Sequence, residues 1–222
     1  MEAEVRDKVV EVSRRLYFKG LVAGAGGNVS AIIRDKGVVL ITPSGLCKGY
    51  LKPEDIVKVD LAGKVLEGYL KPTSELSIHL GIYKIRNDVN AVVHAHPPVS
   101  TGFACAGVPI DYEVFPEVIA MIGEIRFVGY ETPTTQELAD KIAENITDVE
   151  ALLLENHGII TVGSNLEQAY QRAELLEDFA KITFVAKLLG GPKTLPEDEV
   201  RKIAGLESEK YRLKLAKEGK EK

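Results

Sequence analysis

The chain has few of the residues that characterise secreted and membrane proteins. Its 222 residues include two cysteines and no tryptophan, and Cys47 and Cys105 fit no paired or CxxC framework. The first residues, MEAEVRDK, lack the apolar core of a secretion signal, and no apolar run reaches the ~20 residues of a membrane span. We therefore expect a soluble cytoplasmic protein without a membrane partner.

Positive charge is also scarce. Lysine and arginine number 28 against 33 aspartates and glutamates, so the net charge is −5 and offers no basic footprint for a nucleic acid. An apolar content of 45% and a charged content of 27% are typical of a globular protein. The sequence shows no internal repeat, low-complexity stretch or linker. We expect one domain over residues 1–206, followed by a charged C-terminal tail over residues 207–222.

Hydrophobic spacing predicts a single α/β domain with several hairpins and with helices on its faces. The expected helices span 2–19, 73–86, 99–106, 134–145, 164–189 and 197–204, and the expected strands span 28–33, 38–42, 56–60, 64–67, 91–93, 125–130, 151–154 and 159–162. Two helix starts have the capping-box pattern, which makes Thr134 and Ser164 the predicted N-caps. Thr73 or Ser74 can cap the helix that begins beside Glu75.

A histidine pair closes the strand that begins at Ala91. His94 and His96 are two residues apart, so on a strand they point to the same face, and we expect nearly parallel rings. Two strand-end histidines, one solvated and one bonded to backbone, are the alternative. His157 is the candidate third ligand, because it lies where a buried strand breaks at an Asn-His-Gly turn, and three histidines with a vacant fourth position describe a catalytic zinc site. His79 is interpreted as a packed, hydrogen-bonded residue.

Glu75 is the candidate acid/base, although a glutamate in a first helical turn is also favourable to the helix dipole without any chemistry. Three turns combine small residues with hydroxyl or amide donors and suit an anion, namely Gly27-Asn28, Ser44-Gly45 and Thr73-Ser74. The sequence contains no P-loop, and its glycine-rich turn does not follow the Rossmann order of strand, turn and helix.

Five motifs together resemble the class II aldolase family, in the branch of fuculose-phosphate aldolases and ribulose-phosphate epimerases. The resemblance covers roughly residues 5–189 and rests on the order and spacing of all five motifs. They are Gly27-Asn28-Val29-Ser30, Thr42-Pro43-Ser44-Gly45, Pro72-Thr73-Ser74-Glu75, Val93-His94-Ala95-His96-Pro97 and Glu155-Asn156-His157-Gly158.

The resemblance implies a fold, an assembly and a reaction. The expected fold is a central, mainly antiparallel sheet flanked by helices on both faces, assembled as a homotetramer with active sites at subunit interfaces. The expected reaction is cleavage of L-fuculose-1-phosphate or a similar ketose-1-phosphate into dihydroxyacetone phosphate and an aldehyde such as L-lactaldehyde. By motif position, His94, His96 and His157 would bind zinc, Glu75 would carry the proton, and the phosphate would be held by Asn28, Ser44, Gly45, Thr73 and Ser74.

The chain departs from the family pattern at two places. Ala25 stands where fuculose-phosphate aldolases commonly carry a threonine, which removes one hydroxyl from the phosphate turn. The family also uses a tyrosine from a neighbouring subunit for the aldehyde-side proton. Tyr112 is the candidate here, with Tyr211 in the tail for a second family tyrosine; an ordinary interface or surface tyrosine is the alternative for each.

Three other functions fit the same resemblance. Ribulose-phosphate 4-epimerases usually have an aspartate at the position of Glu75, and methylthioribulose-1-phosphate dehydratase has a similar metal site but eliminates water. A non-catalytic scaffold, as in the adducin head domain, keeps the fold but not the metal ligands. The three histidines and Glu75 argue against such a scaffold.

Overall fold

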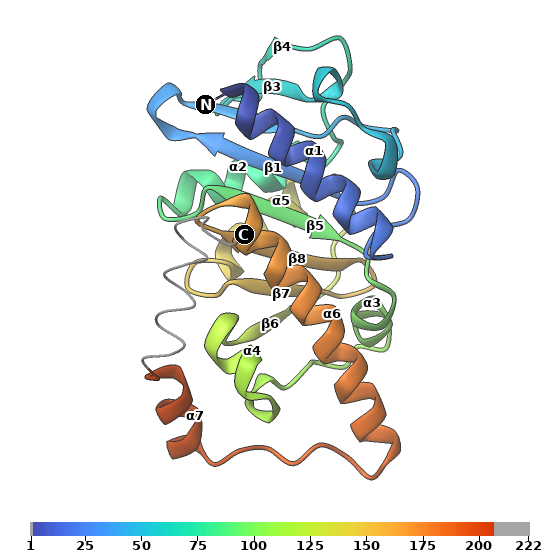
Figure 1. The fold of residues 1–222 in the computed structure, drawn as a ribbon, viewed down its shortest axis with the longest axis vertical. Coiled ribbons are helices and arrows are strands. Elements are labelled where there is room, and N and C mark those ends of the chain that lie inside the picture. Colours follow the sequence, from blue (N-terminus) through green and yellow to red (C-terminus); the bar gives the residue numbers. More distant parts are fainter. Residues whose placement is uncertain (1, 207–222) are drawn as a thin grey trace.

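A computed structural model describes residues 2–206, which are built around one eight-stranded sheet (Figure 1). The strand order is β4-β3-β2-β1-β5-β8-β7-β6, and every neighbouring pair is antiparallel except β6 with β7. The strands are β1 Asn28–Ile33, β2 Val38–Ile41, β3 Val57–Asp60, β4 Val65–Glu67, β5 Ala91–Ala95, β6 Ile125–Val128, β7 Ala151–Leu154 and β8 Gly158–Gly163. The predicted α/β fold with a mainly antiparallel sheet is confirmed.

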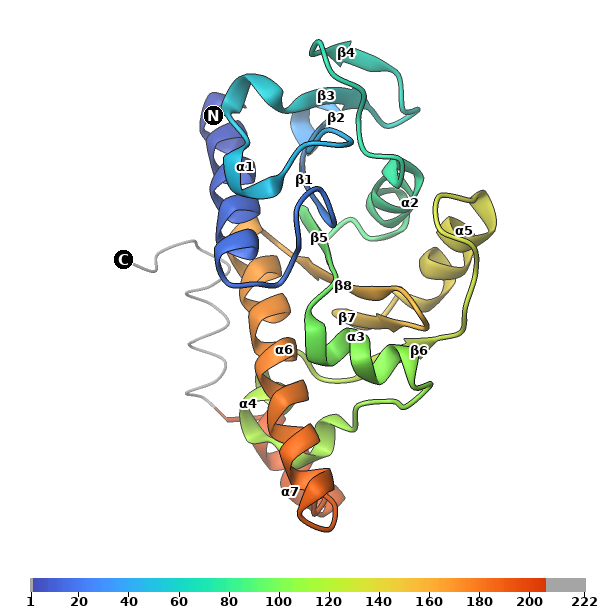
Figure 2. The same ribbon diagram turned by 90° about the vertical axis from the view of Figure 1, so that its right-hand side faces the viewer.

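Helices cover both faces of the sheet, as Figure 2 shows edge-on. Helices α1, α3, α4 and α6 pack with one core, and α2 and α5 pack with the other. The helices are α1 Glu2–Phe18, α2 Leu76–Ile85, α3 Pro98–Cys105, α4 Pro116–Met121, α5 Gln136–Asn145, α6 Leu166–Leu188 and α7 Glu197–Ala204. Short α4 is an element that the sequence did not predict. No helix in the described part of the chain is long and apolar enough to cross a membrane.

The central strands are apolar on both faces, which is why the sheet carries helices on both sides. In β5, Ala91, Val93 and Ala95 join the core beneath α1 and α6, whereas Val92 joins the core beneath α2 and α5. His94 is two residues after Val92, so its side chain lies on the same face of the strand. It points to the α2 side, where it approaches the start of that helix. The strand therefore buries hydrophobic side chains on one face while it presents a histidine on the other.

The middle of the sheet brings distant motifs together. Antiparallel pairing of β1 with β5 sets Asn28 opposite His94, and pairing of β5 with β8 sets His94 opposite Ile160. The β7–β8 hairpin turns through Glu155, Asn156 and His157, beside the end of β5. Segments that are more than 60 residues apart in the chain thus meet at one end of three neighbouring strands.

The N-caps of α5 and α6 lie one residue later than the sequence predicted. Thr135 and Asn165 are the caps, and each side chain accepts a hydrogen bond from the backbone N–H three residues on. Thr134 instead has a positive φ of 71° and belongs to the preceding turn. The capping-box assignments of Thr134 and Ser164 are therefore wrong, because hydrophobic spacing locates a helix start only to within a residue or two.

Glu177 of α6 caps helix α3 from across the fold. Its carboxylate accepts hydrogen bonds from the backbone N–H groups of Val99 and Ser100 at 3.1 and 2.9 Å, and from the Ser100 hydroxyl at 2.8 Å. Because α3 follows directly after the second histidine of the pair, this buried carboxylate anchors the segment that leaves the site.

We expect Glu177→Ala to lower the free energy of unfolding by about 2–4 kcal/mol, because it leaves buried donors at the start of α3 without a partner. Urea denaturation followed by circular dichroism measures the change. The matched control is Glu174→Ala, which removes a partly exposed ion pair with Lys19 and is expected to change stability by under about 1 kcal/mol. Equal small losses in both variants would contradict the anchoring role.

Candidate active site

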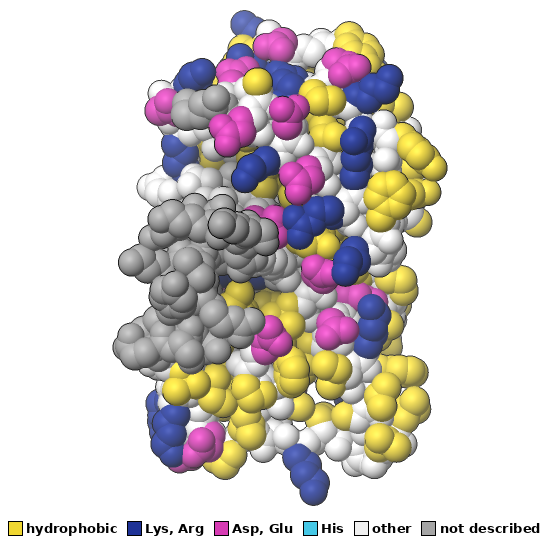
Figure 3. Space-filling view, viewed as in Figure 1, with side chains coloured by type: hydrophobic (Ala, Val, Ile, Leu, Met, Phe, Trp, Pro, Cys, Tyr) yellow, Lys and Arg dark blue, Asp and Glu magenta, His cyan; other side chains and the backbone are white. Residues whose placement is uncertain are grey.

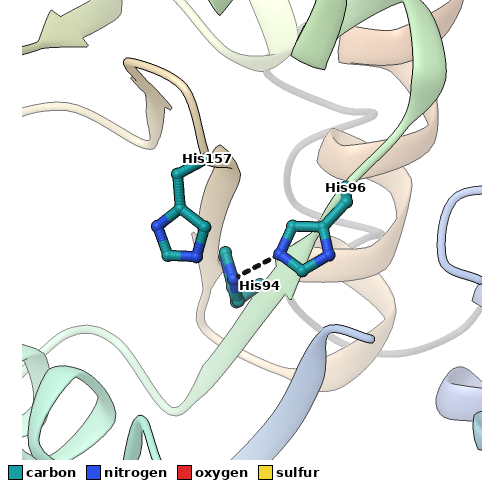
Figure 4. A group of neighbouring side chains, drawn as sticks. All are labelled: His94, His96 and His157. Atoms are coloured by element: carbon teal, nitrogen blue, oxygen red, sulfur yellow. Dashed lines mark hydrogen bonds between the residues drawn. The ribbon is translucent and has the colours of Figure 1, made fainter. Parts of the chain in front are cut away.

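Three histidines converge at the end of β5 (Figure 4). His94 comes from β5, His96 follows the end of that strand, and His157 comes from the β7–β8 turn. One ring nitrogen of each lies within 4.8 Å of the others, and the Nε2 atoms of His94 and His96 are 2.9 Å apart. The structure therefore brings together the three residues that the sequence proposed as metal ligands.

The rings of His94 and His96 are nearly perpendicular, at 81°, so the expectation of parallel rings is wrong. The reason is that β5 ends at Ala95. His96 lies beyond the sheet ladder, where its backbone N–H donates to the Leu21 carbonyl and Pro97 follows. Strand alternation fixes the side of the sheet on which a side chain lies, but it does not fix the torsion of a residue past the strand end.

The hydrogen bond at His94 Nδ1 sets the tautomer of this ring. Nδ1 lies 2.9 Å from the Ile159 carbonyl oxygen, which can only accept, so Nδ1 carries the proton. The lone pair of Nε2 is then directed at the other two histidines. Burial lowers the pKa of His94 to about 3, which keeps the ring neutral. A neutral imidazole with its second nitrogen bonded to a carbonyl is the form that ligates metals.

Gly158 allows the hairpin to approach the histidine pair. A Cβ at this position would overlap the Ala95 carbonyl oxygen and would lie 2.7 Å from His96 Cδ2. The preceding turn requires a left-handed residue, and Asn156 supplies it with a φ of 54°. The lack of a side chain at Gly158 therefore permits the close approach of the hairpin to the end of β5.

Glu75 faces the histidines from the start of α2. Its Oε2 is 3.3 Å from His94 Nε2, and its Oε1 is 3.2 Å from His157 Nε2. Burial works to raise the pKa of this carboxyl, but its polar neighbours His94 and His157 and the hydrogen bond donated by Asn28 hold the pKa below its usual value. The carboxylate therefore stays ionised although only 7% of the residue is exposed.

The first turn of α2 differs in detail from the prediction. The helix begins at Leu76 with Glu75 as its N-cap residue, and no side chain caps it. The Thr73 hydroxyl instead accepts a hydrogen bond from the Glu75 backbone N–H at 3.3 Å, just before the helix. The expectation that Thr73 or Ser74 caps α2 is wrong, and Thr73 supports the backbone of Glu75 in its place.

The donor set has the character of a cation site. His94 Nε2 presents a lone pair, the carboxylate oxygens of Glu75 can only accept, and Glu75 Oε1 is buried without a hydrogen-bond partner among the described residues. Electron-pair donors that converge in a buried space repel one another unless a cation lies between them. Three imidazole nitrogens beside one carboxylate therefore fit a divalent metal ion.

Two of the proposed phosphate turns are held side by side. The Ser44 N–H donates to the Lys71 carbonyl, the Thr73 N–H donates to the Thr42 carbonyl, and Pro43 and Pro72 form an isolated bridge. Ser44, Gly45 and Ser74 are exposed, whereas Thr73 and Asn28 are buried. The structure thus places the hydroxyl and amide groups that the sequence singled out around the beginning of α2.

Lys48 is a residue of this region that sequence reasoning missed. It is only 2% exposed, and its Nζ donates to the carbonyl oxygens of Ala25 and Leu46 at 2.8 and 3.1 Å. Its backbone N–H also donates to the Gly24 carbonyl, so Lys48 joins the glycine-rich turn to the turn that holds Ser44. Burial lowers the pKa of Lys48 to about 8. The sequence carried no signal for it, since most lysines are exposed.

The two tyrosine candidates are not placed with the histidines. Tyr112 lies in the short 3₁₀ helix Tyr112–Val114 before α4, where it is half-buried against the core on the α1 and α6 side of the sheet. Glu75 and His94 lie on the opposite, α2 side. Tyr211 falls outside the described residues. The role given to Tyr112 therefore requires a neighbouring subunit and stays a prediction.

Residues 7–184 match the model of a protein family described as Class II Aldolase and Adducin N-terminal domain. The chain belongs to this family. The resemblance read from the five motifs is confirmed, and the protein is an enzyme of the class II aldolase type.

Similar proteins carry more than one activity. The chain is 41% identical to a 5-deoxy-D-ribulose 1-phosphate aldolase of Bacillus thuringiensis, over 90% of this chain and 93% of the relative. It is 33% identical to a 3-oxo-tetronate 4-phosphate decarboxylase of Escherichia coli, over 83% of this chain and 88% of the relative. A solved L-fuculose 1-phosphate aldolase has a TM-score of 0.86 at 36% identity, with 94% of this chain and 96% of that one covered.

We expect His96→Ala to abolish tight metal binding, because the site loses one of its three nitrogen ligands. Metal content after dialysis, measured by mass spectrometry, should fall by at least about 10-fold relative to the unaltered protein. Cys105→Ala removes an exposed thiol outside the histidine group and should leave metal content unchanged. A His96→Ala protein that retains its metal would contradict the ligand assignment.

The buried Lys48 predicts a pH dependence of stability. The pKa of Lys48 is about 8 in the folded protein, and its ordinary value is 10.5. At a pH between these two pKa values, the unfolded chain therefore binds one proton more than the folded protein does. Stability relative to Lys48→Met should therefore rise by on the order of 2–3 kcal/mol from about pH 7.5 to about pH 10.5. Urea denaturation at both pH values measures it. The same comparison with Lys52→Met, at an exposed lysine, should show no such rise. A stability difference between the unaltered protein and Lys48→Met that is the same at both pH values would disprove the burial of the Lys48 charge.

Proposed function

We propose that this protein is a zinc-dependent aldolase that cleaves a ketose 1-phosphate into dihydroxyacetone phosphate and an aldehyde. The observation that supports this most directly is the convergence of three imidazoles and one buried carboxylate beside donor-rich turns. Zinc is the metal that a three-histidine set with room for substrate suits best. His94, His96 and His157 would hold it.

The metal would stabilise the charge that forms in the reaction, and the Glu75 carboxylate would transfer the proton. Breaking a carbon–carbon bond next to a ketone leaves negative charge on the ketone-derived oxygen, and bound zinc supplies Lewis-acid stabilisation of that charge. Glu75 moves the proton on and off carbon. Its lowered pKa keeps the carboxylate ionised at neutral pH, and Oε1, which lacks a hydrogen-bond donor among the described residues, is the oxygen open to accept the proton.

The phosphate would be held by Asn28, Ser44, Gly45, Thr73 and Ser74. Hydroxyl, amide and backbone donors at the start of α2 suit a dianion, because the N-terminal end of a helix carries partial positive charge. The buried ammonium of Lys48 adds a positive charge to the same turns and compensates in part for the hydroxyl that Ala25 lacks. Anchoring the phosphate there fixes the position of the reacting carbons near Glu75.

The substrate would be L-fuculose 1-phosphate or 5-deoxyribulose 1-phosphate. Both are ketose 1-phosphates, and the similarity to two aldolases named for them supports this choice. Cleavage of either would release dihydroxyacetone phosphate, with L-lactaldehyde from the first and acetaldehyde from the second. The similarity to a decarboxylase gives a second candidate, because loss of carbon dioxide from a 3-oxo acid leaves the same kind of enolate charge.

We further propose a cytoplasmic homotetramer with active sites at subunit interfaces. An exposed apolar strip at the end of α6, made by Phe184, Val185, Leu188 and Leu189, supports an interface, and Figure 3 shows hydrophobic side chains gathered on the lower right where α6 ends. A neighbouring groove between α3 and α6 begins at Pro98, two residues after His96. A subunit seated there would contact α3, the helix that follows the histidine pair in the chain.

A panel of phosphorylated substrates tests the function. The zinc-loaded protein is incubated with L-fuculose 1-phosphate, 5-deoxyribulose 1-phosphate, L-ribulose 5-phosphate, methylthioribulose 1-phosphate and 3-oxo-tetronate 4-phosphate. Release of aldehyde and dihydroxyacetone phosphate is measured beside epimerisation, dehydration and loss of carbon dioxide. We expect cleavage of a ketose 1-phosphate to be the fastest reaction. Faster epimerisation, dehydration or decarboxylation would overturn the proposal in favour of that activity.

We expect Glu75→Gln to retain zinc but to lower kcat by about 10²–10⁴-fold, because the amide cannot carry the proton while the three imidazoles remain. Steady-state cleavage rates and metal content are measured on the same preparation. Glu54→Gln changes an exposed carboxylate outside the site and should leave both quantities unchanged. Near-normal turnover in Glu75→Gln would rule out its role as the proton carrier.

A further inference from the structure

A line of hydrogen bonds runs from Glu75 into the core on the α2 side of the sheet. Asn28 Nδ2 donates to Glu75 Oε2 at 2.8 Å, and Asn28 Oδ1 is hydrogen-bonded to Nε2 of His79. His79 Nδ1 lies 2.6 Å from the Ser30 hydroxyl, which in turn lies 2.7 Å from the Tyr83 hydroxyl. His79 and Ser30 are fully buried, and Tyr83 is 1% exposed.

The periodicities of one strand and one helix produce this line. Asn28 and Ser30 are two residues apart on β1 and therefore point to the same face. Glu75, His79 and Tyr83 recur every four residues along α2 and therefore share one side of that helix. The two rows interleave, so that each polar group in one row meets a partner in the other. The buried polar groups are satisfied without water.

The donor and acceptor of every hydrogen bond in the line follow from the Glu75 carboxylate at one end. A carboxylate only accepts, so the amide nitrogen of Asn28 must face Glu75 and the amide oxygen must face His79. His79 therefore carries its proton on Nε2 and accepts at Nδ1 from the Ser30 hydroxyl. Tyr83 must then donate to Ser30. Burial lowers the pKa of His79 to about 3 and raises the pKa of Tyr83, so both stay neutral.

We propose that His79, held by Ser30 and Tyr83, is a positioning residue that fixes the amide of Asn28 with its nitrogen toward Glu75 and the substrate phosphate. This inference rests on the proposed function, in which Asn28 helps to bind phosphate. One N–H of the amide donates to Glu75, and the second N–H would donate to the phosphate. Both ring nitrogens of His79 are taken up by Ser30 and Asn28, so its hydrogen bonds reach the site only through Asn28.

The alternative orientation of Asn28 shows why such a fixing group matters. If the amide turned over, its oxygen would face the Glu75 carboxylate and the phosphate dianion, and all three groups can only accept. An asparagine has little intrinsic preference between the two orientations, because its oxygen and nitrogen ends are nearly equal in size. The Glu75 carboxylate selects one of them from the nitrogen end, and the Nε2–H of His79 holds the same orientation from the oxygen end. Loss of this donor should weaken phosphate binding while the three metal-binding histidines remain.

A double-mutant cycle of His79 with Asn28 tests the proposal. His79→Leu is expected to raise the KM for the ketose phosphate and the Ki of inorganic phosphate by about 10-fold, with metal content unchanged. Asn28→Ala should raise both by at least as much. Because His79 acts through Asn28, the double variant should bind no more weakly than Asn28→Ala alone. Additive losses would overturn the proposal, since they would show that His79 acts independently.

A conservative variant separates positioning from packing. His79→Gln places an amide N–H near the position of Nε2 and should restore phosphate binding to within about 3-fold of the unaltered protein. If His79→Leu fails to fold, Tyr83→Phe provides the test, because it removes only the hydroxyl that supports Ser30. It should raise the Ki of phosphate, whereas Tyr170→Phe, at an equally buried tyrosine on α6, should not. Equal Ki values in Tyr83→Phe and Tyr170→Phe would overturn the role of the line.

A spectroscopic measurement on the unaltered protein needs no turnover. Nitrogen-15 NMR of the imidazoles should show His79 as a neutral ring protonated on Nε2. A ring protonated on Nδ1 would overturn the proposal whatever the activity. If the panel shows no aldol cleavage but His79 has the Nε2–H form and the cycle holds for inorganic phosphate, the proposed function fails while the positioning role stands.

Discussion

The site depends on the antiparallel pairing of β1 with β5, which sets Asn28 directly opposite His94. A slip of one residue would turn every side chain of a strand to its other face, so this register decides whether the amide and the imidazole meet Glu75 at all. Hydrophobic side chains enforce the register, since both strands are apolar on the faces between the polar positions. The packing of two cores thus fixes the chemistry at the strand ends.

Glu75 is the residue at which the parts of the site meet. Its carboxylate lies beside two of the histidines, its backbone N–H is supported by Thr73, and Asn28 donates to one of its oxygens. The proposed metal, phosphate and proton-transfer groups are therefore joined through one side chain. Such a concentration of acceptors in a buried space opposes folding, and a bound cation would offset it.

The candidate site is built from groups that local structure places at the same end of the sheet. The β7–β8 turn contributes His157, the end of β5 contributes two more histidines, and the start of α2 contributes the carboxylate. Relatives named as aldolases and as a decarboxylase share this family, so the fold alone does not fix the reaction. The exposed apolar strip on α6 is where the proposed subunit interface would lie.

The sequence by itself determined the α/β class and nearly all helices and strands, because these follow from local periodicity. The mainly antiparallel sheet and the grouping of the three histidines with Glu75 were implied by the resemblance of the five ordered motifs to class II aldolases. Only the tertiary structure decided the perpendicular rings of His94 and His96, the caps of α5 and α6, the burial of Lys48 and the line from His79 to Glu75. These features depend on torsions past a strand end and on contacts between distant segments, which no local pattern encodes.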